Sequence, residues 1–167
     1  VSVALGPAGA GPADPLDGPF GLEADGTGLA FVASRDNDRA FLVTPSGVSR
    51  VLDATGGGTG SPFDSPFAVA RDGAGNAFVA GASSDNVFRI AAGGGVSLAL
   101  GPAGDGVAAL DGPFAIAVAA DGTLIAASLN TNHVFRVPPG GPAASLLGPA
   151  GDVVTPLLAP DALALAP

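Results

Sequence analysis

The stretch PFAVARDGAGNAFVAGASSDNVFRIAAGGGVSLAL, residues 66–100, decides the fold because it recurs along the chain. Its opening Pro66-Phe67 has counterparts at Pro19-Phe20 and Pro113-Phe114, 47 residues away on either side, and one more step reaches Pro160. Aligned at this interval, the chain matches itself without gaps from Pro19 to its end. A fixed period of this length is typical of a repeat architecture in which each repeat is one supersecondary unit.

Each repeat contains four short apolar runs separated by turn residues. In residues 66–100 these runs are PFAVA, NAFVAGA, VFRIA and VSLAL, and Asp, Gly and Ser fill the breaks. Runs of about five residues bounded in this way predict strands, and no stretch keeps the 3.6-residue period of a helix. We expect the pairs Asp25-Gly26, Asp72-Gly73 and Asp121-Gly122 to supply the positive φ of hairpin turns.

Four strands in a repeat of this length indicate a β-propeller blade. The sequence therefore predicts an all-β fold, a partial β-propeller with complete blades at residues 19–53, 66–100 and 113–147. Residues 1–6 are predicted to be the last strand of a preceding blade, and residues 160–166 the first strand of a following one. A closed propeller needs about four to eight blades, so we expect this chain to be a stretch of a longer propeller.

The segments GPFAIAVAADGTLIAAS (112–128) and DNVFRIAAGGGV (85–96), with the linkers GPAGAGPADPLDGPF (6–20) and GPAGDGVAALDGPF (101–114), resemble the NHL-repeat family of propellers. The resemblance covers all three repeats. It implies a propeller of six blades when complete, as in the related gluconolactonase-like proteins, and an extracellular or periplasmic location, since bacterial modules of this family are often exported.

The charge and residue composition argue against some classes of binding partner. The formal net charge is −9, with six basic residues, all Arg, which argues against nucleic acid and anionic membranes because both need clustered basic residues. No apolar run is long enough to insert into a membrane, and the absence of Cys excludes disulfides. We expect the nine Phe to supply a large share of the packing between blades.

Polar residues recur at one end of the predicted blades. The connection into the first strand and the loop between the second and third strands share a face, and loops on a rigid scaffold commonly carry function. We predict that this face binds a protein, peptide or glycan ligand. The candidate residues are Asp17, Asp36, Asp38, Asp64, Asp85, Asn86, Asp111, Asn130, Asn132 and His133.

A metal site is the alternative for part of this set. Asp17-Gly18-Pro19 and Asp111-Gly112-Pro113 are similar to the Glu-Gly-Pro with which gluconolactonase-like enzymes begin a divalent metal site. The resemblance would make Asp17, Asp64 and Asp111 ligands of Ca²⁺ or another divalent cation in a hydrolase, since oxygen ligands suit such ions. An acid repeated in every blade, however, is more typical of a turn-stabilising acceptor.

Catalysis has little support in the sequence. His133 is the single histidine, whereas a zinc site needs three or four nitrogen or sulfur ligands. We therefore expect a non-catalytic binding module without a cofactor, completed by further blades. The alternatives are the metal-dependent hydrolase and a structural repeat in a large surface protein.

Overall fold

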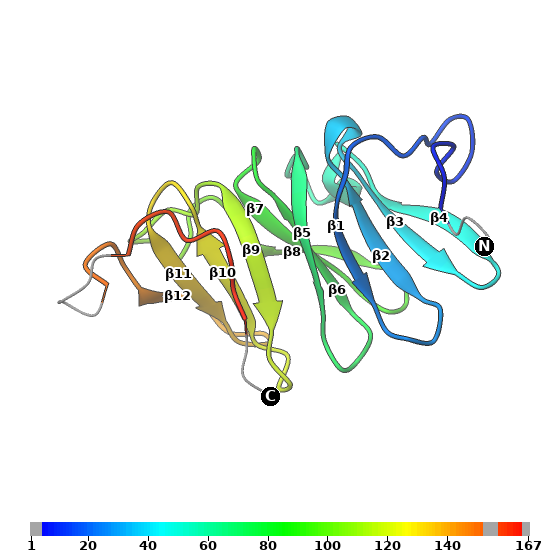
Figure 1. The fold of residues 1–167 in the computed structure, drawn as a ribbon. Helices are drawn as coiled ribbons and strands as arrows, with labels where there is room; N and C mark the ends of the chain where they lie inside the picture. Colours follow the sequence, from blue (N-terminus) through cyan, green and yellow to red (C-terminus); the bar gives the residue numbers. More distant parts are fainter. Residues whose placement is uncertain (1–4, 152–156, 165–167) are drawn as a thin grey trace.

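The computed structural model describes residues 5–151 and 157–164, which form three four-stranded antiparallel sheets arranged as a fan (Figure 1). The strands of each sheet follow one another in chain order. Blade 1 contains β1 (Pro19–Ala24), β2 (Ala30–Ser34), β3 (Arg39–Thr44) and β4 (Gly47–Leu52). Blade 2 contains β5 (Pro66–Arg71), β6 (Ala77–Gly81), β7 (Asn86–Ile90) and β8 (Val96–Leu100). Blade 3 contains β9 (Pro113–Val118), β10 (Leu124–Ser128), β11 (His133–Val137) and β12 (Ala144–Leu147).

Among the described residues, the remaining helical structure is limited to two short 3₁₀ turns, η1 (Arg35–Asn37) and η2 (Gly56–Gly58). The predicted all-β fold of four-stranded repeats is confirmed. None of the described residues belongs to a helix that is long and apolar enough to cross a membrane.

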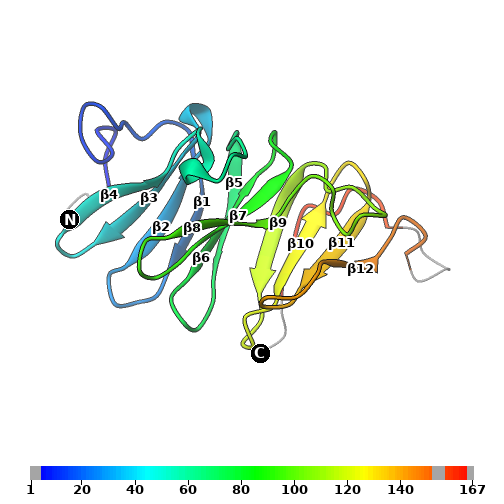
Figure 2. The same ribbon diagram turned by 180° about the vertical axis from the view of Figure 1, so that it is seen from behind.

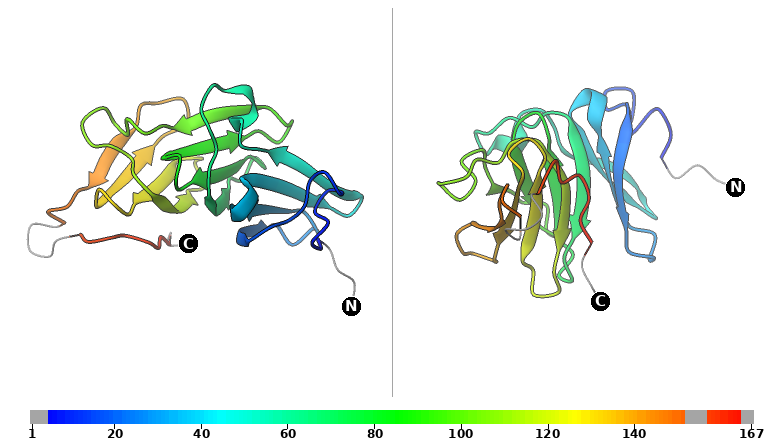
Figure 3. Two further views of the ribbon diagram at one scale, coloured as in Figure 1. Left: turned by 90° about the horizontal axis from the view of Figure 1, so that it is seen from above. Right: turned by 60° about the vertical axis from the view of Figure 1, so that its left-hand side comes forward.

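The first strands of the three blades lie side by side. β5 contacts β1 on one side and β9 on the other, while β4, β8 and β12 form the opposite edge of each sheet (Figures 2 and 3). Each first strand begins with proline, which is tolerated there because the first residue of a strand can lack an N–H group. This arrangement brings the three Pro-Phe pairs next to one another.

The hydrophobic core lies between the blades rather than within one of them. One cluster joins blades 1 and 2, with Phe31 and Leu52 from blade 1 and Val79, Phe88 and Ile90 from blade 2. A second cluster joins blades 2 and 3 in the same way. Alanines at many buried positions let the sheets approach closely, and the larger side chains fill the space that remains.

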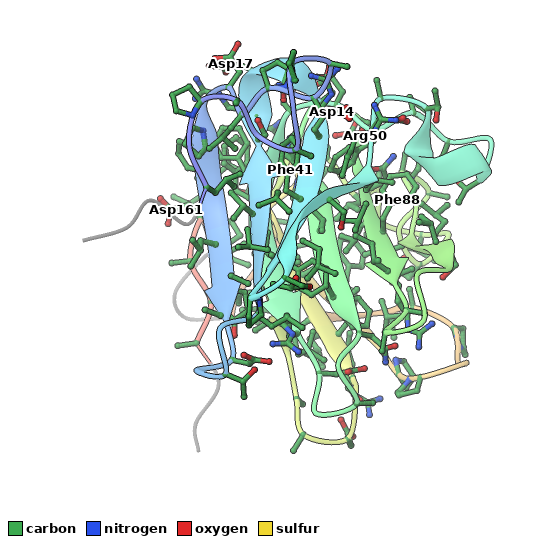
Figure 4. The ribbon with its side chains drawn as sticks, turned by 90° about the vertical axis from the view of Figure 1, so that its right-hand side faces the viewer. Asp14, Asp17, Phe41, Arg50, Phe88 and Asp161 are labelled. Carbon is green, nitrogen blue, oxygen red and sulfur yellow. The ribbon has the colours of Figure 1, made fainter. Side chains whose placement is uncertain are left out.

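The linker before each blade folds over the phenylalanine of that blade's third strand. In blade 2 the Phe63 ring meets the Phe88 ring edge-on, with centroids 5.5 Å apart. In blade 1 the linker lies over Phe41, which is fully buried, and its Asp14 accepts a 2.7 Å hydrogen bond from Arg50 (Figure 4). The linker thus covers part of the open face of blade 1.

The strands predicted outside the three blades, at residues 1–6 and 160–166, lie only in part within the described residues. Residues 1–4, 165 and 166 lie outside the described part, and residues 5–6 and 160–164 form no strand. The first strand of each blade pairs with the second strand of the same blade. No second strand for residues 160–164 is present among the described residues, so these residues have no partner with which to form a sheet.

The turns between first and second strands match the prediction at two of three places. Gly26 and Gly122 have φ values of 76° and 83°. In blade 2 the positive φ lies at Gly75 (84°) and not at Gly73. Gly28, Gly75 and Gly122 are 47 residues apart and have φ values of 94°, 84° and 83°, so the left-handed residue stands at the same repeat position in all three blades.

Candidate binding face

Three of the predicted ligand residues hold the chain where it enters the next repeat, and two of them, Asp38 and Asp85, connect neighbouring blades. Asp38, Asp85 and Asn132 precede the third strands and have φ between 53° and 58°, a left-handed conformation that Asp and Asn tolerate better than most residues. Each of these side chains has an oxygen that accepts a backbone N–H group from the next repeat. The donor is the residue directly before the proline that recurs every 47 residues. We call two of these contacts the inter-blade bridges: Asp38 with Ser65 (2.8 Å) and Asp85 with Gly112 (2.9 Å). Asn132 makes the equivalent contact with Ala159 (2.7 Å), which follows blade 3.

Asn86 and His133 are also engaged with the backbone. Asn86 is buried, and its Nδ2 donates to the carbonyl oxygen of Pro62 at 2.7 Å. His133 Nδ1 lies 2.7 Å from the carbonyl oxygen of Thr131, which makes this nitrogen the donor, and the ring stacks on Phe135. Both side chains therefore have structural contacts that hold the loop in place.

The acids two residues before the blade prolines are fixed through their backbones. The Ser34 hydroxyl contacts both the N–H and the carbonyl oxygen of Asp17 at 2.8 Å, and Ser128 contacts Asp111 in the same way. Ser84 accepts the N–H of Asp64 at 3.0 Å. These serine hydroxyls fix the backbone of the segment before each first strand and do not bind the aspartate carboxylates.

The carboxylates themselves differ in their contacts. Asp111 accepts a 2.7 Å hydrogen bond from Asn130, and Asp64 accepts one from the neighbouring Ser65 hydroxyl at 2.9 Å. The Asp17 carboxylate is exposed and makes no hydrogen bond within residues 5–151 and 157–164.

The metal alternative concerns the same three acids. Within the described residues, no group of three or more His, Cys, Asp or Glu side chains is placed to hold a metal ion. Asp17, Asp64 and Asp111 each lie on a different blade. A Ca²⁺ site built from them stays a prediction from the family resemblance.

A row of three aromatic rings adjoins these acids. Phe20, Phe67 and Phe114 lie on the adjacent first strands, with ring centroids 4.3 Å and 4.4 Å apart. We call this row the phenylalanine ladder. Phe20 is 59% exposed, and on the same strand Leu22 is 65% exposed. Tilted rings at these separations attract one another, so the row forms a continuous apolar surface.

The ladder has a charged neighbour. The Arg35 guanidinium lies 5.5 Å from the Phe20 ring centroid and 5.8 Å from that of Phe67, within the range of a cation–π interaction. Asp36 pairs with Arg35 at 2.6 Å, and this hydrogen bond lowers the pKa of the Asp36 carboxyl. At the position 47 residues after Phe114 stands Asp161, which is exposed (Figure 4).

Sequence reasoning missed the ladder as a surface. It assigned the phenylalanines to packing between blades, as holds for Phe88, which is fully buried. The signal that could have revealed the ladder is the recurrence of Pro-Phe itself, because residues at one period of a propeller repeat lie at equivalent places on adjacent blades.

No family model and no curated protein matches the chain. Solved structures do. An inactive virginiamycin B lyase from Staphylococcus aureus with quinupristin aligns with a TM-score of 0.64 and 18% identity. A nidogen–laminin complex gives 0.61 and 15%, and a protein proposed to be a gluconolactonase gives 0.55 and 16%. These neighbours are propellers. The chain is part of a β-propeller.

The shared fold does not extend to the whole of these proteins. The alignments cover 86%, 80% and 72% of this chain but 44%, 51% and 46% of the lyase, the nidogen–laminin chain and the proposed gluconolactonase. This chain therefore spans about half the length of the propellers it matches. At these identities the likeness concerns the fold alone, and membership of the NHL family stays a prediction.

Proposed function

We propose that this chain is part of a non-catalytic propeller that binds a peptide segment of a partner protein on its phenylalanine ladder. The observation that carries the proposal is the exposure of Phe20 at the end of the ladder, whose other rings, Phe67 and Phe114, are half-buried. Folding buries phenylalanine wherever packing allows, yet more than half of the Phe20 surface remains in water. Exposed apolar rows mark interaction sites, and aromatic residues are enriched in protein interfaces.

The charges around the ladder specify the chemistry of the partner. Asp17, Asp64 and Asp111 stand three residues before the ladder rings, and the nearby Arg35 is already paired with Asp36. The surface therefore offers aromatic faces together with carboxylates. A peptide with apolar side chains for the rings and Lys or Arg for the acids fits both features. A neutral glycan could stack on the rings but would leave the carboxylates without a charged partner.

The proposal also covers the rest of the propeller and the location of the protein. Further blades would extend the ladder and the loop face, and the partner would meet the module outside the cytoplasm. The nidogen–laminin structure, a complex of two proteins, supports the use of a propeller as a protein-binding scaffold.

Selection from a phage-displayed library of random dodecapeptides tests the proposal. We expect enriched peptides to combine basic with aromatic or aliphatic residues. Calorimetry should show that Phe20→Ala weakens their binding at least tenfold. Leu146→Ala removes an apolar side chain of similar exposure (55%) on β12, far along the chain from the ladder, and should leave binding unchanged. Failure to enrich any peptide, or equal affinity of wild type and Phe20→Ala, would contradict the proposal.

A further inference from the structure

A second concave region lies between blades 2 and 3, at the opposite end of the strands from the loop face. It is a groove of about 630 Å³, within the range of small-molecule sites. Blade 2 contributes the turn after β5 and parts of β7 and β8, and blade 3 contributes the turn after β9 and residues 137–141. The groove therefore involves none of the residues of the proposed peptide site.

The wall of the groove is apolar. Phe78 and Leu124 line it from the two blades and belong to the buried cluster between them. Leu98, which is 41% exposed, adds apolar surface at the opening. Pro138 and Pro139 form a further side whose backbone is restricted by the proline rings. Because Phe78 and Leu124 are buried, a small apolar group entering the groove would meet chiefly Leu98 and the two prolines, with Phe78 and Leu124 behind them.

One cation lines this apolar wall without a paired anion. No carboxylate of the described residues lies within 4.0 Å of Arg89, although Asp72 and Asp121 line the same groove. The Asp72 carboxylate is occupied at both oxygens by its own turn, through the N–H groups of residues 74 and 76 and the Asn76 side chain. The Arg89 guanidinium thus keeps its donors for a ligand anion.

Asp121 is the complementary group. Its Oδ1 accepts the N–H of Thr123 at 2.9 Å, and Oδ2 makes no hydrogen bond within the described residues. The hydrogen bond from Thr123 lowers the pKa of the Asp121 carboxyl, which is therefore ionised at neutral pH. The groove consequently offers one free guanidinium, one carboxylate oxygen and an apolar wall.

The corresponding place between blades 1 and 2 shows that this arrangement is not required by the repeat. The residue aligned with Arg89 in blade 1 is Leu42, which is partly buried and packs against the apolar cluster of that interface. The repeat accepts an apolar side chain here, so the arginine is not needed to build a blade.

We infer that the groove between blades 2 and 3 binds a small zwitterion with an apolar side chain, that is, a free apolar α-amino acid. Arg89 holds the carboxylate of the ligand, Asp121 holds its ammonium group, and Leu98, Pro138 and Pro139 contact its side chain. This site is separate from the ladder and acts independently of the peptide proposed to bind there.

Amide chemical shifts of the ¹⁵N-labelled chain, titrated with L-phenylalanine, test the inference. We expect shifts confined to groove residues. N-acetyl-L-phenylalanine lacks the ammonium and L-phenylalanine amide lacks the carboxylate, so each should bind at least tenfold more weakly.

Arg89→Leu installs the residue found in blade 1 and should reduce the affinity for L-phenylalanine at least tenfold. Arg89→Lys, which keeps the charge but not the planar fork, should give an intermediate affinity and serves if the leucine variant does not fold. The absence of groove shifts at 20 mM ligand (roughly the limit for weak site binding) would overturn the inference. Binding that is undiminished in both variants would overturn it as well.

Discussion

Two interfaces join the blades of this molecule, one between blades 1 and 2 and one between blades 2 and 3. They have the same backbone arrangement but differ in the side chains that pack between the sheets. Both are closed by an inter-blade bridge from an aspartate with positive φ, Asp38 in one and Asp85 in the other. The side chains at three aligned positions differ between the two interfaces. The first interface has Phe63, Leu42 and Arg71. At the same three positions the second interface has Leu110, Arg89 and Val118.

These differences change the character of each interface. The first is filled by an edge-on aromatic pair and by Arg71, which pairs with Asp25 at 3.0 Å and lies over the Phe31 ring. The second keeps a groove with Arg89 on its wall. The backbone bridges hold the blades at both places, so the space between blades can vary without loss of the fold. Repeat proteins can therefore place a site in one interface and a tightly packed contact in the next.

Removal of the buried phenylalanines should have the largest effect. Phe88 and Phe135 occupy the same place in blades 2 and 3 and are fully buried, and truncation of a buried Phe to Ala costs about 3–5 kcal/mol. Phe88→Ala should cost more than Phe135→Ala, because Phe88 meets the buried Phe63 ring edge-on, whereas Phe135 stacks on the half-buried His133 ring. Urea unfolding measures both. Equal losses would show that the Phe63–Phe88 pair stabilises the first interface no more than the stacked His133 stabilises the second.

Deletion of an inter-blade bridge should come next. Asp85→Gly keeps a residue that adopts positive φ but removes the acceptor of the Gly112 N–H. We expect a loss of about 1–3 kcal/mol in the free energy of unfolding, the cost of leaving a half-buried donor without its charged acceptor. Asp85→Asn imitates Asn132 of blade 3 and should retain most of the stability. If the two variants unfold at the same urea concentration, the bridge is not a determinant of blade packing.

A smaller change is expected when the second interface is made to resemble the first. Arg89→Leu should raise the free energy of unfolding by up to about 1 kcal/mol, because a leucine would bury apolar surface against Phe78 and Leu124 as Leu42 does in blade 1. Thermal unfolding provides the measurement. A clear loss of stability would mean that Arg89 supports the fold, and the groove could then not be regarded as free for a ligand.

The smallest effect concerns the acid limb of stability at the first interface. The Asp25 pKa lies well below its usual value, chiefly through the Thr27 side-chain hydrogen bond and then through the Thr27 backbone and Arg71. A depressed folded-state pKa contributes stability above the unfolded-state value of about 4, and this is lost as pH falls through the folded-state pKa. Thr27→Val should therefore raise the Asp25 pKa more than Arg71→Val. Carboxyl NMR titration of the two variants measures this order, and the reverse order would contradict it.

Short-range patterns in the sequence predicted the blades well. The 47-residue period and four apolar runs per repeat identified the all-β propeller and the end of the blades at which loops gather. Turn residues and strand runs act over a few positions, so they can be read locally. The candidate acids were placed on the loop face for the same reason, because Asp17, Asp64 and Asp111 directly precede first strands.

What the sequence by itself determined is therefore the repeat, its strands and its loop face. Tertiary structure alone decided which polar side chains remain free there. Asp38 and Asp85 resembled surface ligands in sequence, yet each reaches a backbone N–H 27 residues away on the next blade. The groove has the same origin, because it forms only where neighbouring sheets pack against each other. The row of phenylalanines could be read from the recurrence of Pro-Phe, whereas the exposure of Phe20 became visible only in the packed structure.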